Sequence, residues 1–390
     1  MDQSLRRNIP ALYIIKICKW FMLYMPVVKL FYEENNLHDF DLFLLHGIYS
    51  VIIALLEIPS GYIADVWGRK FAIITGLAFG LVGFFTYSIS FGFWGFLLAE
   101  VALGIGQGFI SGSDTALLFD TLKQNHRQRT YAKYEGRITA SGNLAEAMAG
   151  ITVTLLAFET MRGYYKLQTI LIFIAFLTGW FLQEPTYHKS NKPASFKAIM
   201  DIVQYTLFKN RILSRYVIFS SIVGVASLTM AWFAQIFLYE AGVKKAHFGI
   251  VWTTLNLMVA AGSFVAFRVS RITGPKIALG AILVFLSGGY MLTSQTITLY
   301  GVSFLFLFYF IRGTAHPILK ERINRNTRSE VRATVMSIRS MMIRIMFAAG
   351  GPLLGLMRDN IGLEAALLTT GFAIIIPGSI IYLNIARGKR

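Results

Sequence analysis

Apolar residues run along this chain in long stretches with few or no charges, separated by short polar segments. A helix that crosses about 30 Å of hydrocarbon needs roughly 17–25 predominantly apolar residues. The stretches are long enough for this, so we predict twelve membrane-spanning helices. They cover residues 11–32, 42–64, 71–90, 92–119, 137–158, 165–183, 213–238, 247–267, 276–294, 297–319, 334–357 and 363–386.

The composition favours a membrane protein and excludes several other classes. Of 390 residues, 55% are hydrophobic and 15% are charged, whereas soluble domains average roughly 25% charged residues. The mean hydropathy is +0.57. The chain has 34 Gly, 9 Pro and 1 Cys, which excludes collagen-like, disordered and disulfide-stapled proteins. We therefore expect an all-α membrane protein whose twelve spans and short loops account for its length.

The net charge of +17 is located mainly in the loops, because most Lys and Arg lie between the apolar stretches. We therefore expect no nucleic acid as a partner. If the N-terminus is inside, 27 of the 37 Lys and Arg fall in inner segments. An excess of these residues on cytoplasmic loops orients membrane proteins, so we expect both termini in the cytoplasm. Basic inner loops and short outer loops fit a bacterial inner membrane, and the first stretch is expected to be retained because it lacks a cleavage site.

The two halves of the chain resemble each other, which predicts a duplicated bundle. Segment 112–120 in the fourth stretch matches segment 313–321 in the tenth. Transporters are often built from such repeats, with the solute site at the repeat interface. The second part of the linker between the halves is either an amphipathic helix at the inner membrane surface or a solvated basic segment. The predicted parts are an N-terminal six-helix bundle at 1–183, a cytoplasmic linker at 184–212 and a C-terminal six-helix bundle at 213–390.

The turn between the second and third stretches carries the most specific motif. Asp65 ends one span, and Arg69 and Lys70 open the next. Gly61 and Gly68 are expected to allow close backbone approach and a tight turn. Such a charge cluster can latch neighbouring helices in one state, and the alternative is an ordinary basic turn. The whole motif, Gly61-Tyr-Ile-Ala-Asp65-Val-Trp-Gly68-Arg69-Lys70, resembles the loop signature of the major facilitator superfamily.

Two glycine-rich segments resemble further motifs of the same superfamily. Segment 100–108 in the fourth stretch has the spacing of the second motif, but Glu100 stands where the superfamily has an Arg. We expect its glycines to allow tight helix packing. Segment 348–355 in the eleventh stretch looks like the antiporter motif. Its Gly351 and Pro352 are expected to kink the helix, with plain packing as the alternative.

The resemblance implies the major facilitator fold, in which two pseudo-symmetric six-helix bundles rock around a central cavity. By similarity to twelve-span drug/proton antiporters, the leading hypothesis is a secondary active transporter that exports small amphipathic organic molecules in exchange for protons. The alternative cargo is an anionic metabolite, a siderophore or a lipid-like solute, moved in either direction. A third hypothesis is a transporter-like sensor or scaffold. An enzyme is disfavoured because no nucleophile, base and orienting group share a suitable spacing.

Ionisable side chains inside the spans are candidates for the transport site. Inserting each into the membrane costs roughly 2.5–3.5 kcal/mol, so such residues usually mark ion or substrate paths. Glu146 is the first choice for a proton carrier. Its span starts at Arg137, and Glu146 lies roughly 14 Å further along the helix, which places it near the midplane of the membrane. Lys16 and Lys19 share a helix face and are expected to pair with Glu146 or to bind an anionic solute. For each residue the alternative is a fixed ion pair between helices. The remaining candidates are Glu100 and Glu57 for protons, and Arg312 and Arg344 for substrate.

Polar and aromatic side chains complete the predicted site. Tyr24, Tyr49 and Trp232 are expected to line a cavity and to stack on an amphipathic solute. Asn143 in the fifth stretch is a further substrate-binding candidate. The six His show no metal-binding spacing, so we expect no metal and no other cofactor. The expected partners are a small-molecule substrate, protons and the lipid bilayer, and the expected state is a monomer.

Overall fold

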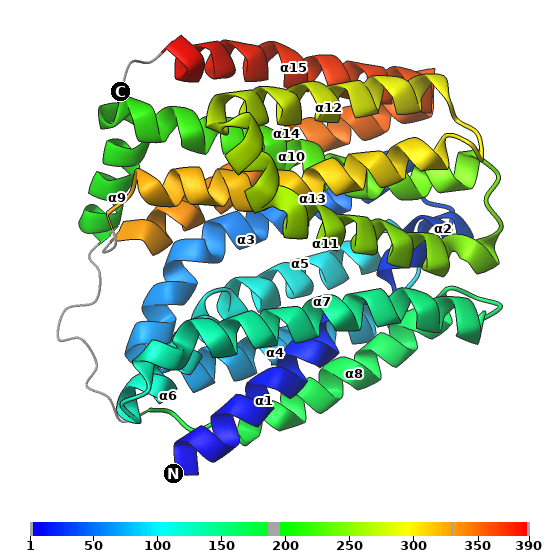
Figure 1. Cartoon of the computed structure of the whole chain (residues 1–390). Helices are drawn as coiled ribbons and strands as arrows, with labels where there is room; N and C mark the ends of the chain where they lie inside the picture. Colours follow the sequence, from blue (N-terminus) through cyan, green and yellow to red (C-terminus); the bar gives the residue numbers. More distant parts are fainter. Residues whose placement is uncertain (1–2, 186–195, 329–330, 388–390) are drawn as a thin grey trace. The chain divides into compact units, whose positions relative to one another are not determined.

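The computed structural model describes residues 3–185, 196–328 and 331–387, and these ranges contain helices and no strand. Ten segments of this part are long and apolar enough to cross a membrane. The predicted all-α membrane fold is therefore confirmed (Figure 1). The α-helices are α1 Gln3–Trp20, α2 Val28–Glu34, α3 Asp39–Trp67, α4 Arg69–Ile89, α5 Gly92–Ile110, α6 Ser113–Gln124, α7 Tyr131–Leu156, α8 Arg162–Trp180, α9 Phe196–Gln204, α10 Arg211–Glu240, α11 Phe248–Thr273, α12 Pro275–Gln295, α13 Val302–Arg325, α14 Arg332–Ile361 and α15 Leu363–Arg387.

Helix packing divides the chain into two compact units. Unit 1 comprises residues 1–37 and 48–194, and unit 2 comprises residues 38–47 and 195–390. The division near residue 194 falls within the predicted linker. A second division falls inside α3, whose first turns belong to unit 2, although the sequence pattern assigned the whole second stretch to the N-terminal bundle. These turns pack on α10 and α14, because the Phe43 ring lies 4.9 Å from Phe233 and 6.1 Å from Phe347.

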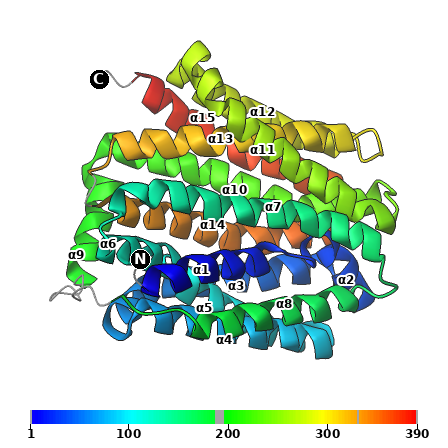
Figure 2. The same cartoon turned by 60° about the horizontal axis from the view of Figure 1, so that its bottom comes forward.

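In unit 1, small residues let the helices approach closely. Helix α4 packs against α5 and α8, and α1 lies between α7 and α8 (Figure 2). A Cβ atom on Gly106 of α5 would lie 2.6 Å from the Gly76 carbonyl oxygen of α4. Only Gly fits at such a contact, as expected for the glycines of segment 100–108.

One end of unit 1 gathers the start of α1, the α3–α4 turn and the ends of α6 and α8. Asn8 of α1 donates hydrogen bonds of 2.8 Å to the Thr121 hydroxyl and the Gln183 carbonyl oxygen. Because the loops at this end are rich in Lys and Arg, we refer to it as the basic end of unit 1 and to the opposite one as the far end. The far end carries the end of α4 and the starts of α5 and α8.

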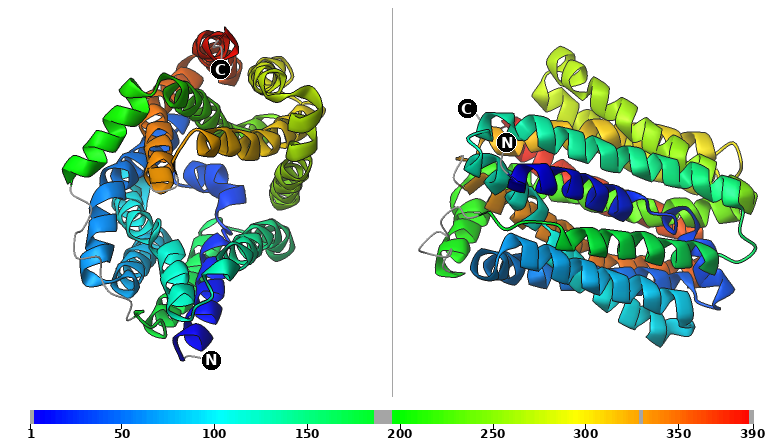
Figure 3. Two further views of the ribbon diagram at one scale, coloured as in Figure 1. Left: turned by 60° about the vertical axis from the view of Figure 1, so that its left-hand side comes forward. Right: turned by 90° about the horizontal axis from the view of Figure 1, so that it is seen from below.

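In unit 2, α11 packs on α13 and α12 packs on α15 (Figures 1 and 3). The α11–α13 contact is close, because a Cβ atom on Gly313 would overlap the Val259 carbonyl oxygen. Basic side chains tie the last turn of α15 to its neighbours. Arg215 donates to the Asn384 carbonyl oxygen at 2.8 Å, and Lys276 donates to that of Ala386 at 2.5 Å.

Two predicted spans are interrupted helices rather than continuous ones. The first breaks after α1 and resumes at a short 3-10 turn, Met25–Val27. Gln168 of α8 bridges the break, since it accepts from Leu23 N at 3.1 Å and donates to the Cys18 carbonyl oxygen at 3.4 Å. The fourth breaks between α5 and α6 at Gly112, whose φ of +79° favours glycine. An apolar pattern predicts the length of a span but not such breaks, because the backbone groups freed at a break find partners on other helices.

The described part of the predicted linker contains the short helix α9 and a π-helical turn, Tyr205–Lys209. Ile202 and Leu207 pack against a small core of Leu213, Val217, Ile323 and Val335. The helix and its apolar packing match one part of the amphipathic-helix interpretation, and its place at the membrane surface stays a prediction. The first part of the linker lies largely outside the described residues.

Candidate functional site

Unit 1 brings four predicted site residues to one place. Tyr24 lies in the break that follows α1, within electrostatic reach of Tyr49, Glu100 and Glu146. Glu146 and both tyrosines are partly exposed. Glu100 is 3% exposed. The interrupted first span thus places a phenol within electrostatic reach of a deeply buried carboxylate and a more accessible one.

Glu100 is held by tyrosines that the sequence analysis missed. Tyr87 of α4 donates a hydrogen bond of 2.5 Å to Glu100 Oε1, and the Tyr32 hydroxyl lies 2.9 Å from the Tyr87 hydroxyl. Both tyrosines are at most 1% exposed. A tyrosine in an apolar stretch gives no signal in the sequence, because its ring suits a span whether or not its hydroxyl has a polar partner.

Lys16 and Lys19 line one small cavity in unit 1, as their shared helix face predicts. Lys19 Nζ donates to Gln107 Oε1 at 3.2 Å, and Lys16 Nζ lies 4.8 Å from the centre of the Trp20 ring. The same cavity is lined by two acids, Asp114 and Glu135. The positive charge of the two lysines is therefore opposed by negative charge on α6 and α7.

The loop motif forms a charge cluster at the basic end of unit 1. Asp65 near the end of α3 pairs with Arg69 at the start of α4, and Arg69 also lies 3.9 Å from Asp120 of α6. Gly68 turns the chain with a φ of +108°. Gly61 makes no close approach, since a Cβ atom there would meet no described atom within 4 Å. The expected close contact at Gly61 is therefore absent from this conformation.

A carboxylate that the sequence analysis did not use caps the start of α4. Glu184 accepts hydrogen bonds from the backbone N–H groups of Arg69 and Lys70 at 2.8 and 2.7 Å. Lys70 Nζ donates to the Trp180 carbonyl oxygen at 2.9 Å. A carboxylate at a helix start is stabilising, because the first N–H groups have no partner within the helix. Glu184 lies more than a hundred residues from the motif, so no local pattern indicates the contact.

The glycine-rich segment of α14 packs against the first turns of α3 within unit 2. A Cβ atom on Gly355 would lie 2.9 Å from the Phe40 Cα atom, and one on Gly351 would lie 3.4 Å from the Phe43 ring. Helix α14 continues through Pro352. The described geometry thus assigns these glycines a packing role, and a gating kink at Pro352 stays a prediction.

The other predicted residues of unit 2 lie at separate places. Trp232 is 8% exposed and stacks on His46 with ring centres 3.8 Å apart, so a side chain fills one face of the indole. Arg312 lies over the Tyr309 ring at 5.1 Å. Arg344 is partly exposed, and its buried Nε atom donates no hydrogen bond within the described residues.

Two candidates in the N-terminal half, Asn143 and Glu57, show few contacts that would indicate a binding site. Asn143 is exposed on α7. Glu57 is partly exposed on α3, where its backbone carbonyl oxygen accepts a weak hydrogen bond of 3.5 Å from the Ser60 hydroxyl. Their roles in substrate and proton binding remain predictions.

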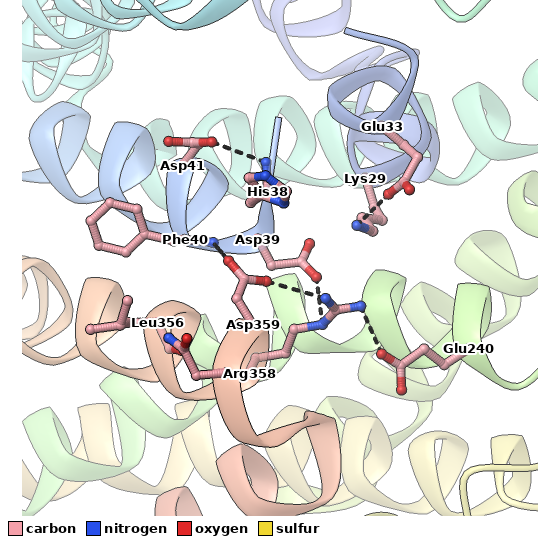
Figure 4. Close-up of polar contacts among 11 residues, drawn as sticks. Lys29, Glu33, His38, Asp39, Phe40, Asp41, Glu240, Leu356, Arg358 and Asp359 are labelled. Carbon is pink, nitrogen blue, oxygen red and sulfur yellow. Dashed lines mark hydrogen bonds and ion pairs between the residues drawn. The ribbon is translucent and has the colours of Figure 1, made fainter. Parts of the chain in front are cut away.

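An arginine-centred cluster in unit 2 was not anticipated (Figure 4). The Arg358 guanidinium lies 2.6 Å from Asp39, 2.7 Å from Glu240 and 3.1 Å from Asp359. Asp359 also accepts a hydrogen bond of 2.8 Å from the Phe40 N–H group at the start of α3. The cluster therefore ties the beginning of α3 to the ends of α10 and α14.

Comparison with known proteins agrees with this architecture. The chain is 19% identical over 369 residues to the uncharacterized MFS-type transporter MJ1560 of Methanocaldococcus jannaschii, covering 93% of each chain. It is 21% identical over 279 residues to the multidrug resistance protein MdtL of Klebsiella pneumoniae, covering 70% of this chain and 69% of MdtL. The crystal structure of the nucleoside transporter NupG superposes with a TM-score of 0.80 and 15% identity over 100% of both chains. The family model of the Major Facilitator Superfamily matches residues 13–351, and this chain belongs to that superfamily of transporters.

Proposed function

We propose that this transporter exports small amphipathic organic molecules in exchange for protons. The observation that carries the proposal is that two predicted carboxylates, Glu100 and Glu146, lie within electrostatic reach of one phenol, Tyr24. Carboxylates inside a span are costly, and such residues often mark a proton path. Similarity to the multidrug resistance protein MdtL supports amphipathic organic cargo.

In the proposed cycle, Glu146 binds a proton when the site faces one side and releases it when the site faces the other. Its partial exposure on α7 allows exchange with solvent, and the nearby Tyr24 ring offers the solute an aromatic surface. The Asp65–Arg69 pair at the basic end of unit 1 holds α3 and α4 together in one state. Cargo and proton thus compete for the conformations that expose Glu146.

We further propose that the chain lies in a bacterial inner membrane as a monomer with both termini in the cytoplasm. The supporting observation is that, in a twelve-span topology, 27 of the 37 Lys and Arg lie on the same side of the membrane as the N-terminus.

Transport by reconstituted protein tests the exchange mechanism. A panel of amphipathic cations, zwitterions and anions is loaded into proteoliposomes, and efflux is measured with and without an imposed pH gradient. We expect the gradient to accelerate efflux of amphipathic molecules by the wild-type chain. Glu146→Gln should abolish this acceleration. Glu159→Gln is the control and should preserve it, because Glu159 is an exposed carboxylate in a loop. Undiminished acceleration in Glu146→Gln would remove Glu146 from the mechanism.

An anionic solute is the second candidate cargo, favoured by the buried Arg344 Nε atom that lacks a hydrogen-bond partner within the described residues. A buried donor of this kind gains a charge-assisted hydrogen bond if it binds an anion. Thermal shift with the same panel separates the two hypotheses. Stabilisation by anions alone, lost in Arg344→Gln, would favour anion transport, and binding without any flux would favour a sensor.

A further inference from the structure

We propose that the hydroxyl groups of Tyr32, Tyr87 and Tyr165 conduct protons between the far end of unit 1 and Glu100. The inference rests on the proton coupling proposed above and adds the route by which a proton reaches the buried carboxylate. None of these three tyrosines was a candidate from the sequence. The path lies entirely within unit 1.

The first part of the path is a chain of two short hydrogen bonds. The Tyr32 and Tyr87 hydroxyls lie 2.9 Å apart, and Tyr87 Oη lies 2.5 Å from Glu100 Oε1. Hydrogen bonds between hydroxyl groups and carboxylates are normally 2.5–2.7 Å long when one partner is charged. The second contact therefore has the length at which a shared proton moves with little displacement of heavy atoms.

Tyr165 supplies the second observation. Its side chain is 1% exposed, and its hydroxyl has no hydrogen-bond partner within the described residues. It lies within electrostatic reach of Tyr32, Glu100 and Arg162. A buried hydroxyl without a partner costs roughly 1–3 kcal/mol, so this position favours a small hydrogen-bonding guest. We assign a water molecule to it, which would connect Tyr165 to the other two hydroxyls.

The surroundings isolate this chain from competing proton acceptors. The Phe31 ring lies 4.1 Å from the Tyr165 ring and 5.0 Å from the Phe96 ring. The three tyrosines are at most 1% exposed, so their hydroxyls lie in buried, largely aromatic surroundings. In such a low-dielectric site, a hydrogen-bonded chain is stronger than it is in water. The proton is therefore guided along the hydroxyls rather than lost to bulk solvent.

Charged groups at the far end hold the helices that carry the three tyrosines. Arg162 donates to the Tyr87 and Ser90 carbonyl oxygens at 2.9 and 2.7 Å and to Asn35 Oδ1 at 2.8 Å. Its charge is opposed by the exposed Glu34, which accepts a hydrogen bond of 2.9 Å from Met161 N. These contacts hold the ends of α2, α4 and α8 together, so the tyrosines on those helices keep their spacing.

The transfer balances without any cofactor. A proton from the far end reaches the water assigned to Tyr165 Oη and passes from it to Tyr32 Oη, as the proton of Tyr32 moves to Tyr87 Oη and the proton of Tyr87 moves to Glu100 Oε1. Both phenols end as they began, and the carboxylate has gained one proton. Rotation of the hydroxyls resets the chain.

A pH jump on the reconstituted full chain tests the path without knowledge of the cargo. Time-resolved infrared difference spectroscopy follows protonation of carboxyl groups, and the band that disappears in Glu100→Gln is assigned to Glu100. We expect Tyr87→Phe to slow the appearance of this band by about tenfold, which corresponds to roughly 1.4 kcal/mol in the barrier. Tyr165→Phe should slow it as well, which keeps the test decisive if Tyr87→Phe does not fold.

Tyr290→Phe is the matched control. Its hydroxyl is also fully buried and donates to the Ala226 carbonyl oxygen at 2.6 Å, but it lies in unit 2. Its loss should leave the rate unchanged. An unchanged rate in both Tyr87→Phe and Tyr165→Phe, or the absence of any Glu100 band across the pH range, would overturn the path. If the path behaves as expected while no pH gradient drives flux, the proposed function fails and the path stands.

Discussion

Two clusters of the molecule use the same chemistry in different surroundings. At the basic end of unit 1, Arg69 lies beside Asp65 and Asp120. In unit 2, Arg358 lies beside Asp39 and two further carboxylates. Each cluster also contains a distant carboxylate that accepts backbone N–H groups at a helix start. One arginine and several acids thus fix a helix start in both units.

The clusters differ in burial, and this difference decides what each contributes. The Asp65 and Arg69 side chains are 40% and 24% exposed, and exposed pairs typically contribute about 0–1 kcal/mol. The Asp39 and Arg358 side chains are 1% and 21% exposed. Breaking a buried pair by removing one partner typically costs 3–5 kcal/mol. The Arg69 cluster can therefore open at small cost, as a latch requires, whereas the Arg358 cluster holds the start of α3 in place.

The largest expected effect follows from removing the centre of the buried cluster. Arg358→Met leaves three carboxylates near one another without their shared cation, so we expect the free energy of unfolding in detergent to fall by about 3 kcal/mol. Arg325→Met is the control, because Arg325 is 65% exposed and pairs with Glu321 across one helical turn. It should cost less than about 1 kcal/mol. Equal losses in the two variants would contradict the comparison.

The separation of the partners along the chain decides which cluster could be predicted from sequence. The Asp65–Arg69 pair lies within one ten-residue motif, four residues apart, so the motif indicated its members directly. Phe40 and Asp359 are 319 residues apart, and a single sequence carries no sign that α3 and α14 meet. The twelve apolar stretches predicted the helices for the same reason that the motif predicted the charge cluster, because both are local patterns. The breaks at Tyr24 and Gly112 depend on distant partners and on one dihedral angle, and they were missed.

A smaller effect is expected from crowding the contact that supports the buried cluster. In Gly355→Ala, the new methyl group would lie 2.9 Å from the Phe40 Cα atom and 3.0 Å from the Asp39 carbonyl oxygen. Backbone cannot move aside easily, so the start of α3 must shift away from Arg358. We expect a loss of about 1–3 kcal/mol in unfolding free energy. Gly350→Ala on the same helix meets nothing within 4 Å among the described residues, and it should be neutral or slightly stabilising. A neutral Gly355→Ala would show that this end of α3 is loosely held.

We expect the smallest effect on stability at the Arg69 cluster. The same variant also separates an effect on stability from an effect on transport. Asp65→Asn removes the charge that faces Arg69, and we expect the free energy of unfolding to change by less than about 1 kcal/mol, because both side chains are partly exposed and solvent screens the pair. If the pair latches α3 and α4 in one state of the cycle, the same variant should still slow gradient-driven efflux several-fold. The two quantities are measured on the same preparation, with Glu321→Gln as the control, since Glu321 forms an exposed pair with Arg325 in unit 2. Equal transport by Asp65→Asn and wild type would reduce the motif to an ordinary basic turn, because the charge would then affect neither the fold nor the cycle.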